Sequence, residues 1–79
     1  MIVWQRRSGI RITLDGAAML RLRESRGWSR REMADSVGVS RVTISNWENE
    51  ECCPSLPQIG KLRGVFGDEL AQSGAVEVA

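Results

Sequence analysis

Two short helices joined by a tight turn, within residues 28–47, constrain the fold of this chain more than any other feature. The segment reads WSRREMADSVGVSRVTISNW. Ser29 followed three residues later by Glu32 is a capping box, which satisfies free backbone amides at the start of a helix. Gly38 supplies the left-handed conformation that a tight helix exit needs, and Ser40 is a favourable cap for the next helix. The sequence therefore predicts one helix that begins just after Ser29 and another just after Ser40.

The second of these helices has a narrow inward face. Only Ile44 and Trp47 are bulky candidates for it, which leaves most of its side chains directed outward. A solvated polar face is common in small helical proteins, so one helix alone would indicate nothing more. The small Ala34, the turn glycine and Ile44 occur together over a short span, which favours two helices that cross steeply as a helix-turn-helix unit.

Three segments carry a family resemblance: LRESRGWSRREMA at residues 22–34, GVSRVTISNWEN at 38–49 and PSL at 54–56. Together they resemble the Cro and λ-repressor type of helix-turn-helix family, over about residues 17–70. The resemblance implies a mainly α fold, a five-helix bundle, and the role of a small Cro-like repressor from a phage or a bacterium. It also implies a double-stranded DNA operator, pseudo-palindromic in sequence, that is bound by a homodimer.

The predicted helix over residues 41–48 is the one expected to enter the major groove, with its first turn nearest the bases. Arg41 can donate two hydrogen bonds to guanine, and Val42 can contact a thymine methyl group. The Ser45 hydroxyl can donate or accept a hydrogen bond, so it does not distinguish one base from another. Asn46 can reach adenine or a phosphate. The predicted base contacts are therefore Arg41, Val42, Ser45 and Asn46.

Phosphate contacts are expected where helices begin, because free amides and the helix dipole favour anions there. Asn49 matches a family residue that often contacts the DNA phosphate backbone. Two arginines at the tip of a predicted N-terminal hairpin are further candidates for phosphate contacts. The predicted phosphate contacts are Arg30, Arg31, Ser40, Thr43, Asn49, Arg6 and Arg7.

Three positions depart from the family pattern. Arg30 stands where relatives commonly have glutamine, while Glu50 and Glu51 stand where they usually have glycine and a basic residue. Carboxylates repel phosphates, so either this loop turns away from the duplex or the N-terminal arginines compensate.

A β-hairpin is predicted over residues 1–14, because apolar and polar side chains alternate around a Ser-Gly turn. Ile2 and Trp4 lie too far forward for the bundle core, so we expect them at a subunit interface. The helix-turn-helix domain is placed at residues 15–72. The tail, residues 73–79, is either frayed or a short strand that pairs with the hairpin. A homodimer would form through the hairpin, the tail or both.

Charge is unevenly distributed along the 79 residues, although the net charge is only +1. Residues 1–31 hold eight arginines against two acids, a charge of +6, whereas residues 32–79 hold three basic residues against eight acids, a charge of −5. A basic region folded beside the two helices would attract a phosphate backbone. An unevenly charged solvated surface is the alternative interpretation.

Composition limits the other classes of function. The chain has no histidine, and Cys52 and Cys53 cannot supply the four ligands of a closed zinc site, so we expect no metal or cofactor unless two subunits share a site. No phosphate-binding loop or acid-base cluster indicates an enzyme. No apolar run approaches the roughly 20 residues of a membrane span, so we expect a soluble, cytoplasmic protein.

One alternative function comes from a different class. A helix-turn-helix can serve as a protein-interaction module or antitoxin, with the acidic carboxyl half as the docking face for a protein partner. Such a module predicts salt-insensitive binding to a protein and weak binding to any duplex, whereas a DNA reader predicts strong salt dependence.

Overall fold

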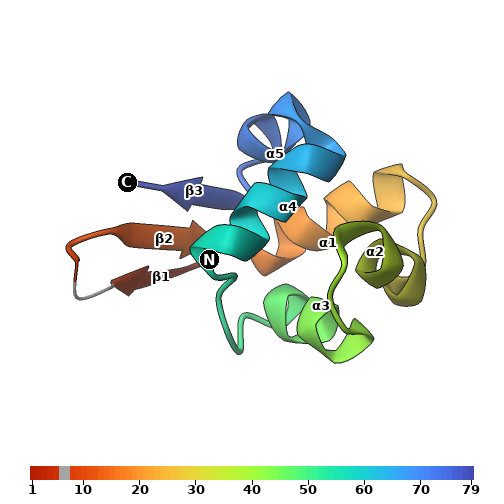
Figure 1. Ribbon diagram of the computed structural model, residues 1–79, viewed down its shortest axis with the longest axis horizontal. Helices are drawn as coiled ribbons and strands as arrows, with labels where there is room; N and C mark the ends of the chain where they lie inside the picture. Colours follow the sequence, from red (N-terminus) through yellow and green to blue (C-terminus); the bar gives the residue numbers. More distant parts are fainter. Residues whose placement is uncertain (6–7) are drawn as a thin grey trace.

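The computed structural model describes residues 1–5 and 8–79 of the chain. Over these residues five helices form a bundle, and a three-stranded sheet extends from one end of it (Figure 1). In chain order the elements are β1 (Ile2–Gln5), β2 (Arg11–Leu14), α1 (Gly16–Ser25), α2 (Arg30–Val37), α3 (Arg41–Glu48), α4 (Leu56–Phe66), α5 (Asp68–Ser73) and β3 (Val76–Val78). The predicted fold class is confirmed. Arg6 and Arg7, two of the predicted phosphate contacts, lie outside the described residues.

The four longer helices begin where capping side chains predict. Asp15 at α1 and Ser40 at α3 each accept a hydrogen bond from the backbone amide three residues further on. Complete capping boxes open α2 and α4, formed by Ser29 with Glu32 and by Ser55 with Gln58. Gly38 ends α2 at a φ of +83°, in the left-handed region that a β-carbon disfavours. The helix-turn-helix unit is therefore held by local chemistry at both of its helix starts.

The tail forms a strand. β3 pairs antiparallel with β2, and β1 pairs antiparallel with the other side of β2, so the strand order is β1-β2-β3. Beyond the end of β3, Ala79 and Arg11 exchange backbone hydrogen bonds of 3.0 and 2.9 Å. Of the two predictions for the tail, pairing with the hairpin is the one observed.

A single core joins the sheet to all five helices. Its buried apolar residues are Ile12, Leu14, Ala18, Met19, Leu22, Met33, Ala34, Val37, Ile44, Trp47, Ile59, Leu62, Phe66, Leu70, Ala75 and Val76. Trp4 is half-buried and packs against this core, so the expectation that it lies too far forward to reach the core was wrong. Val65 of α4 is likewise half-buried and packs against the core.

The described helices are short. The longest, α4, has 11 residues, and none of the helices in the described part of the chain combines the length and apolarity that a membrane crossing requires.

Candidate nucleic-acid interface

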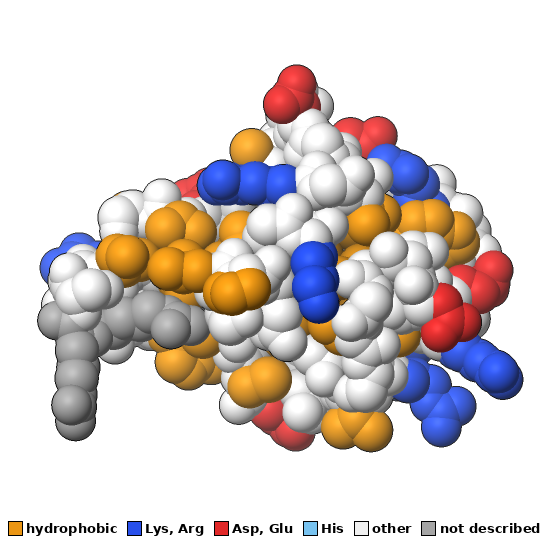
Figure 2. All heavy atoms as spheres, viewed as in Figure 1, with side chains coloured by type: hydrophobic (Ala, Val, Ile, Leu, Met, Phe, Trp, Pro, Cys, Tyr) orange, Lys and Arg blue, Asp and Glu red, His pale blue; other side chains and the backbone are white. Residues whose placement is uncertain are grey.

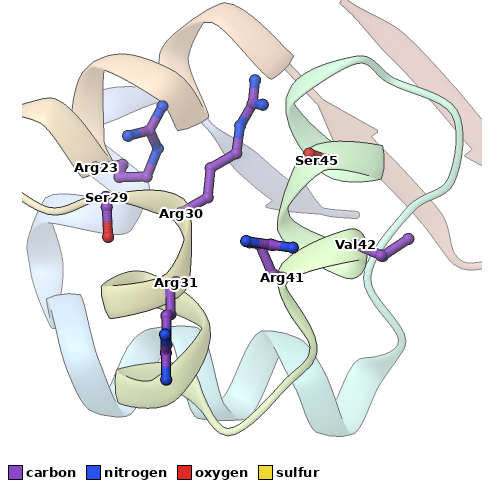
Figure 3. Close-up of a pocket in the computed structure, with 7 residues that line it drawn as sticks. All are labelled: Arg23, Ser29, Arg30, Arg31, Arg41, Val42 and Ser45. Carbon is purple, nitrogen blue, oxygen red and sulfur yellow. The ribbon is translucent and has the colours of Figure 1, made fainter.

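A basic hollow lies between α2 and α3. Its volume is about 560 Å³, and its lining comes from α1, the start of α2 and the outer side of α3 (Figure 3). The lining residues are Arg23, Ser29, Arg30, Arg31, Arg41, Val42 and Ser45. Five of them, Arg30, Arg31, Arg41, Val42 and Ser45, are predicted contacts, so the fold brings predicted base and phosphate readers to one surface. Basic side chains also gather beside α2 and α3 at the lower right of Figure 2.

The first turn of α3 presents two exposed side chains of different character. Arg41 projects into the gap between α2 and α3 (Figure 3). Val42, which also lines the hollow, projects from the other side of α3. Val42 is 65% exposed although it is apolar. An apolar side chain held in water beside a basic one is suited to contact a surface that offers both methyl groups and hydrogen-bond acceptors, as the floor of the major groove does.

Ser45 and Asn46 occupy the next turn of α3, and both are half-buried. Ser45 lines the hollow, whereas Asn46 does not. The Asn46 backbone carbonyl accepts a 2.8 Å hydrogen bond from the backbone amide of Glu51. Asn46 thus contacts the loop after α3, whereas the other three predicted base contacts line the hollow.

The thiols of Cys52 and Cys53 are free and half-buried in that loop. Burial raises the pKa of the Cys52 thiol, and the neighbouring Cys53 adds to the increase. Both cysteines pack against the core rather than lining the hollow, which agrees with a structural role.

Beneath the hollow, Glu48 at the end of α3 joins three helices. Its carboxylate accepts hydrogen bonds from Arg23 of α1, 2.7 Å from Nε to Oε2 and 3.3 Å from Nη2 to Oε1. Arg30 of α2 donates to the same carboxylate, 3.1 Å from Nε to Oε1. The Glu48 side chain is 3% exposed, that of Arg23 13%, and that of Arg30 46%. The buried pair fixes the end of α3, and within the described residues Arg30 uses only its Nε, which leaves its Nη groups available for an anion.

Sequence reasoning missed the pair of Arg23 and Glu48. The two residues lie 25 positions apart, and neither belongs to a local motif such as a cap or a turn. Only the packing of α1 against α3 brings them together. An arginine on an otherwise inward-facing side of α1 is the single available signal, and a solvated arginine gives the same pattern.

The other predicted phosphate contacts lie at helix ends. Arg31 is exposed in the first turn of α2. Ser40 and Thr43 are bonded to each other through their hydroxyl oxygens, 2.8 Å apart, at the start of α3. Asn49 is exposed at the opposite end of α3, where its backbone amide donates a hydrogen bond to the backbone carbonyl of Ser45. Arg31, Ser40 and Thr43 thus flank the helix starts, while Asn49 stands apart.

Glu50 points away from the hollow. Its Oε2 accepts a 2.9 Å hydrogen bond from the Gly16 amide at the start of α1 and lies 2.8 Å from the Met1 amine. The Met1 amine, followed by the Gly16 amide, holds the pKa of Glu50 below its usual range. The backbone of Glu50 has a φ of +59°, the conformation that suits the glycine usual in relatives. The Glu50 carboxylate is thus held at the start of α1 and does not line the hollow, while both predictions for this loop relative to a duplex stay predictions.

Comparisons with known proteins agree with this geometry. The helix-turn-helix family model matches residues 19–70. A relative from Thermococcus kodakarensis, provisionally named an HTH-type transcriptional regulatory protein, is 34% identical over 70 residues, which is 89% of this chain and 22% of the relative. Relatives with the same provisional name from Methanosarcina acetivorans and Pyrococcus furiosus are 36% and 31% identical, over 81% and 90% of this chain and 20% and 22% of their own length.

The chain therefore belongs to the helix-turn-helix family of the Cro and λ-repressor type. It spans about a fifth of the length of the curated relatives it matches. No solved structure matches it significantly.

Proposed function

We propose that this chain is a sequence-specific, double-stranded DNA-binding transcriptional regulator that reads the major groove with α3. The observation that carries the proposal is the hollow itself, where exposed Arg41 and Val42 of α3 stand beside Arg30 and Arg31 of α2. Base readers and phosphate binders on one surface are the requirement for a recognition helix.

Reading of bases falls to the outer side of α3. Arg41 donates to guanine O6 and N7, a contact typically worth about 1–3 kcal/mol of discrimination. Val42 contacts a thymine methyl group, and Ser45 lies one turn further along the same helix. Asn46, whose backbone contacts the loop after α3, contributes an adenine or phosphate contact.

Phosphate contacts hold the helix in register without reading sequence. Arg30, Arg31 and Ser40 supply them on both sides of the hollow, with Thr43 and Asn49 further along α3. Arg6 and Arg7, which lie outside the described residues, remain proposed phosphate contacts. Arg23, Arg30, Arg31 and Arg41 line the hollow, and this local positive charge favours a phosphate backbone there.

The family membership further supports the role of a Cro-like repressor in the cytoplasm or nucleoid of a prokaryotic cell, acting as a homodimer. One recognition helix gives a limited contact, and two copies related by a two-fold axis double it on half-sites about 34 Å apart. The domain in this account spans residues 15–72, between the hairpin at 1–14 and the tail at 73–79.

The salt dependence of duplex binding tests the proposal. The logarithm of affinity should fall linearly with the logarithm of salt concentration, and Arg31→Ala should reduce that slope by about one unit. Glu32→Gln, also exposed in the first turn of α2, is a matched control that removes a negative charge and should not reduce the slope. Absent or salt-insensitive duplex binding would refute the proposal and favour the protein-interaction module.

A further inference from the structure

The sheet has two free edges within the described residues. β1 and β3 each pair only with β2, so each outer strand leaves one row of backbone N–H and C=O groups unpaired. An unpaired strand edge is a template for pairing with another chain, and proteins that must stay monomeric commonly block it with charge, proline or a bulge. Residues 2–5 of β1 contain no charged residue and no proline.

The hydrogen-bond alternation of an antiparallel sheet identifies the free groups. Arg11 and Ala79 exchange both backbone hydrogen bonds, so odd-numbered residues of β2 face β3 and even-numbered ones face β1. In the register of β1 on β2, Trp4 lies opposite Ile12. The backbone of Trp4 is therefore directed toward β2.

It follows that Val3 and Gln5 carry the free backbone groups of β1. On the far side of the sheet, the same alternation assigns the free groups of β3 to Val76 and Val78. Each edge thus has two residues with free backbone groups. If a second copy pairs with both residues of an edge, the two-fold axis passes beside the residue between them. That residue is Trp4 in β1 and Glu77 in β3.

We infer that β1 pairs antiparallel with β1 of a second copy of this chain, with Trp4 of one copy opposite Trp4 of the other. Val3 of each copy then bonds Gln5 of the other, and every free N–H and C=O group of the strand is used. The two central residues form a non-hydrogen-bonded pair, whose Cα atoms approach to about 4.5 Å. Directly opposed aromatic side chains stabilise such a pair.

Charge makes self-pairing through β1 more favourable than self-pairing through β3. The equivalent pairing through β3 places Glu77 directly opposite Glu77 of the second copy, and like charges in that position are destabilising. Pairing through β1 brings no charged side chains of the strand together. A symmetric contact sets each residue against its own kind near the axis, so the uncharged edge is the self-complementary one.

Exposed apolar surface lies along the chosen edge. Ile2 is 39% and Val3 is 55% exposed, and apolar side chains gather over the sheet on the left of Figure 2. A second copy at β1 would cover part of this surface. The inference rests on the proposed function only for the expectation of a second copy, because two-fold operators need two recognition helices.

Proline variants of the full chain test the inference without DNA. Val3→Pro and Gln5→Pro each remove a free-edge N–H and leave the hydrogen bonds between β1 and β2 in place, and proline is tolerated on edge strands. Val78→Pro is the matched control, since it removes a free-edge N–H from β3. Sedimentation equilibrium over a concentration series should give a dimer for the unmodified chain and for Val78→Pro, and monomers for the two β1 variants.

Circular dichroism should be the same for all these chains, which establishes that they fold. If a proline variant does not fold, amide exchange in the unmodified chain decides: Val3 and Gln5 should be protected, and should lose protection on dilution, while Val76 and Val78 exchange fast at all concentrations. A monomeric unmodified chain, a dimer lost through Val78→Pro, or unprotected Val3 and Gln5 would overturn the inference. A dimer that binds no duplex would leave it standing and remove the proposed function.

Discussion

The Arg23 guanidinium and the Glu48 carboxylate form an ion pair beneath the candidate interface, with Nε 2.7 Å from Oε2 and both side chains nearly buried. Arg23 also donates to the Trp28 carbonyl through Nη1, at 2.8 Å. The pair thereby connects α1, the start of the helix-turn-helix unit and the end of α3. The position of α3 therefore depends on this buried contact.

Glu48→Gln should lower the free energy of unfolding by about 3–5 kcal/mol, because it leaves the buried Arg23 charge without its counter-ion. Urea denaturation measures the loss. Arg30→Ala is the control, since it removes the exposed partner of the same carboxylate and should cost about 0–1 kcal/mol. Equal, small losses for both variants would show that the buried pair does not hold the bundle together.

Gly16→Ala should destabilise the fold by about 1–3 kcal/mol, because a β-carbon at Gly16 would lie 2.2 Å from the Glu48 carbonyl oxygen and force α1 away from α3. Gly60→Ala provides the matched control within a helix. A β-carbon at Gly60 meets nothing within 4 Å, so the higher helix propensity of alanine should stabilise the fold by about 0.4–1 kcal/mol. Thermal melts of the two variants should shift in opposite directions, and a shift in the same direction would contradict the close packing of Gly16.

Glu50→Gln should make the stability less dependent on acid pH. The pKa of Glu50 is lowered by the Met1 amine and the Gly16 amide, so its carboxylate stabilises the folded state above the pKa of the unfolded chain. That contribution is lost as the pH falls through the lower, folded pKa. The stability difference between the unmodified chain and Glu50→Gln should therefore shrink between about pH 6 and about pH 3.

Urea titrations at several pH values measure this difference. Glu51→Gln is the neighbouring control, because the Glu51 side chain is exposed and makes no ion pair in the described part of the chain. A difference for Glu50→Gln that stays constant with pH would mean that the Glu50 carboxylate is not tied to the start of α1.

The features of this fold that sequence predicted are local ones. Ser29 and Ser40 bond amides three residues away, so their roles as helix caps are written in short motifs and are confirmed. Contacts between distant segments left no such signal. The pairing of Arg23 with Glu48 and the turn of Glu50 toward Gly16 both depend on the packing of α1 against the end of α3.

In the candidate site, too, local patterns predicted some features, while others depend on contacts between distant segments. Arg41 and Val42 were predicted as outward-facing because helix periodicity alone decides which side of a short helix is apolar, and both are exposed. The backbone contact of Asn46 with Glu51 follows from the path of the loop after α3, which periodicity does not describe. Arg30 was placed correctly at the start of α2, but its partner Glu48 was not foreseen.

Base reading by the outer side of α3 in the major groove can be measured by selecting preferred sites from random duplexes. Parallel selections with the unmodified chain, Arg41→Ala and the control Arg63→Ala, an exposed arginine of α4, compare the recovered sequences position by position. Arg41→Ala should lose preference at one position of each half-site, while Arg63→Ala should recover the unmodified pattern. An unchanged profile for Arg41→Ala, or no sequence preference for the unmodified chain, would contradict base reading by α3.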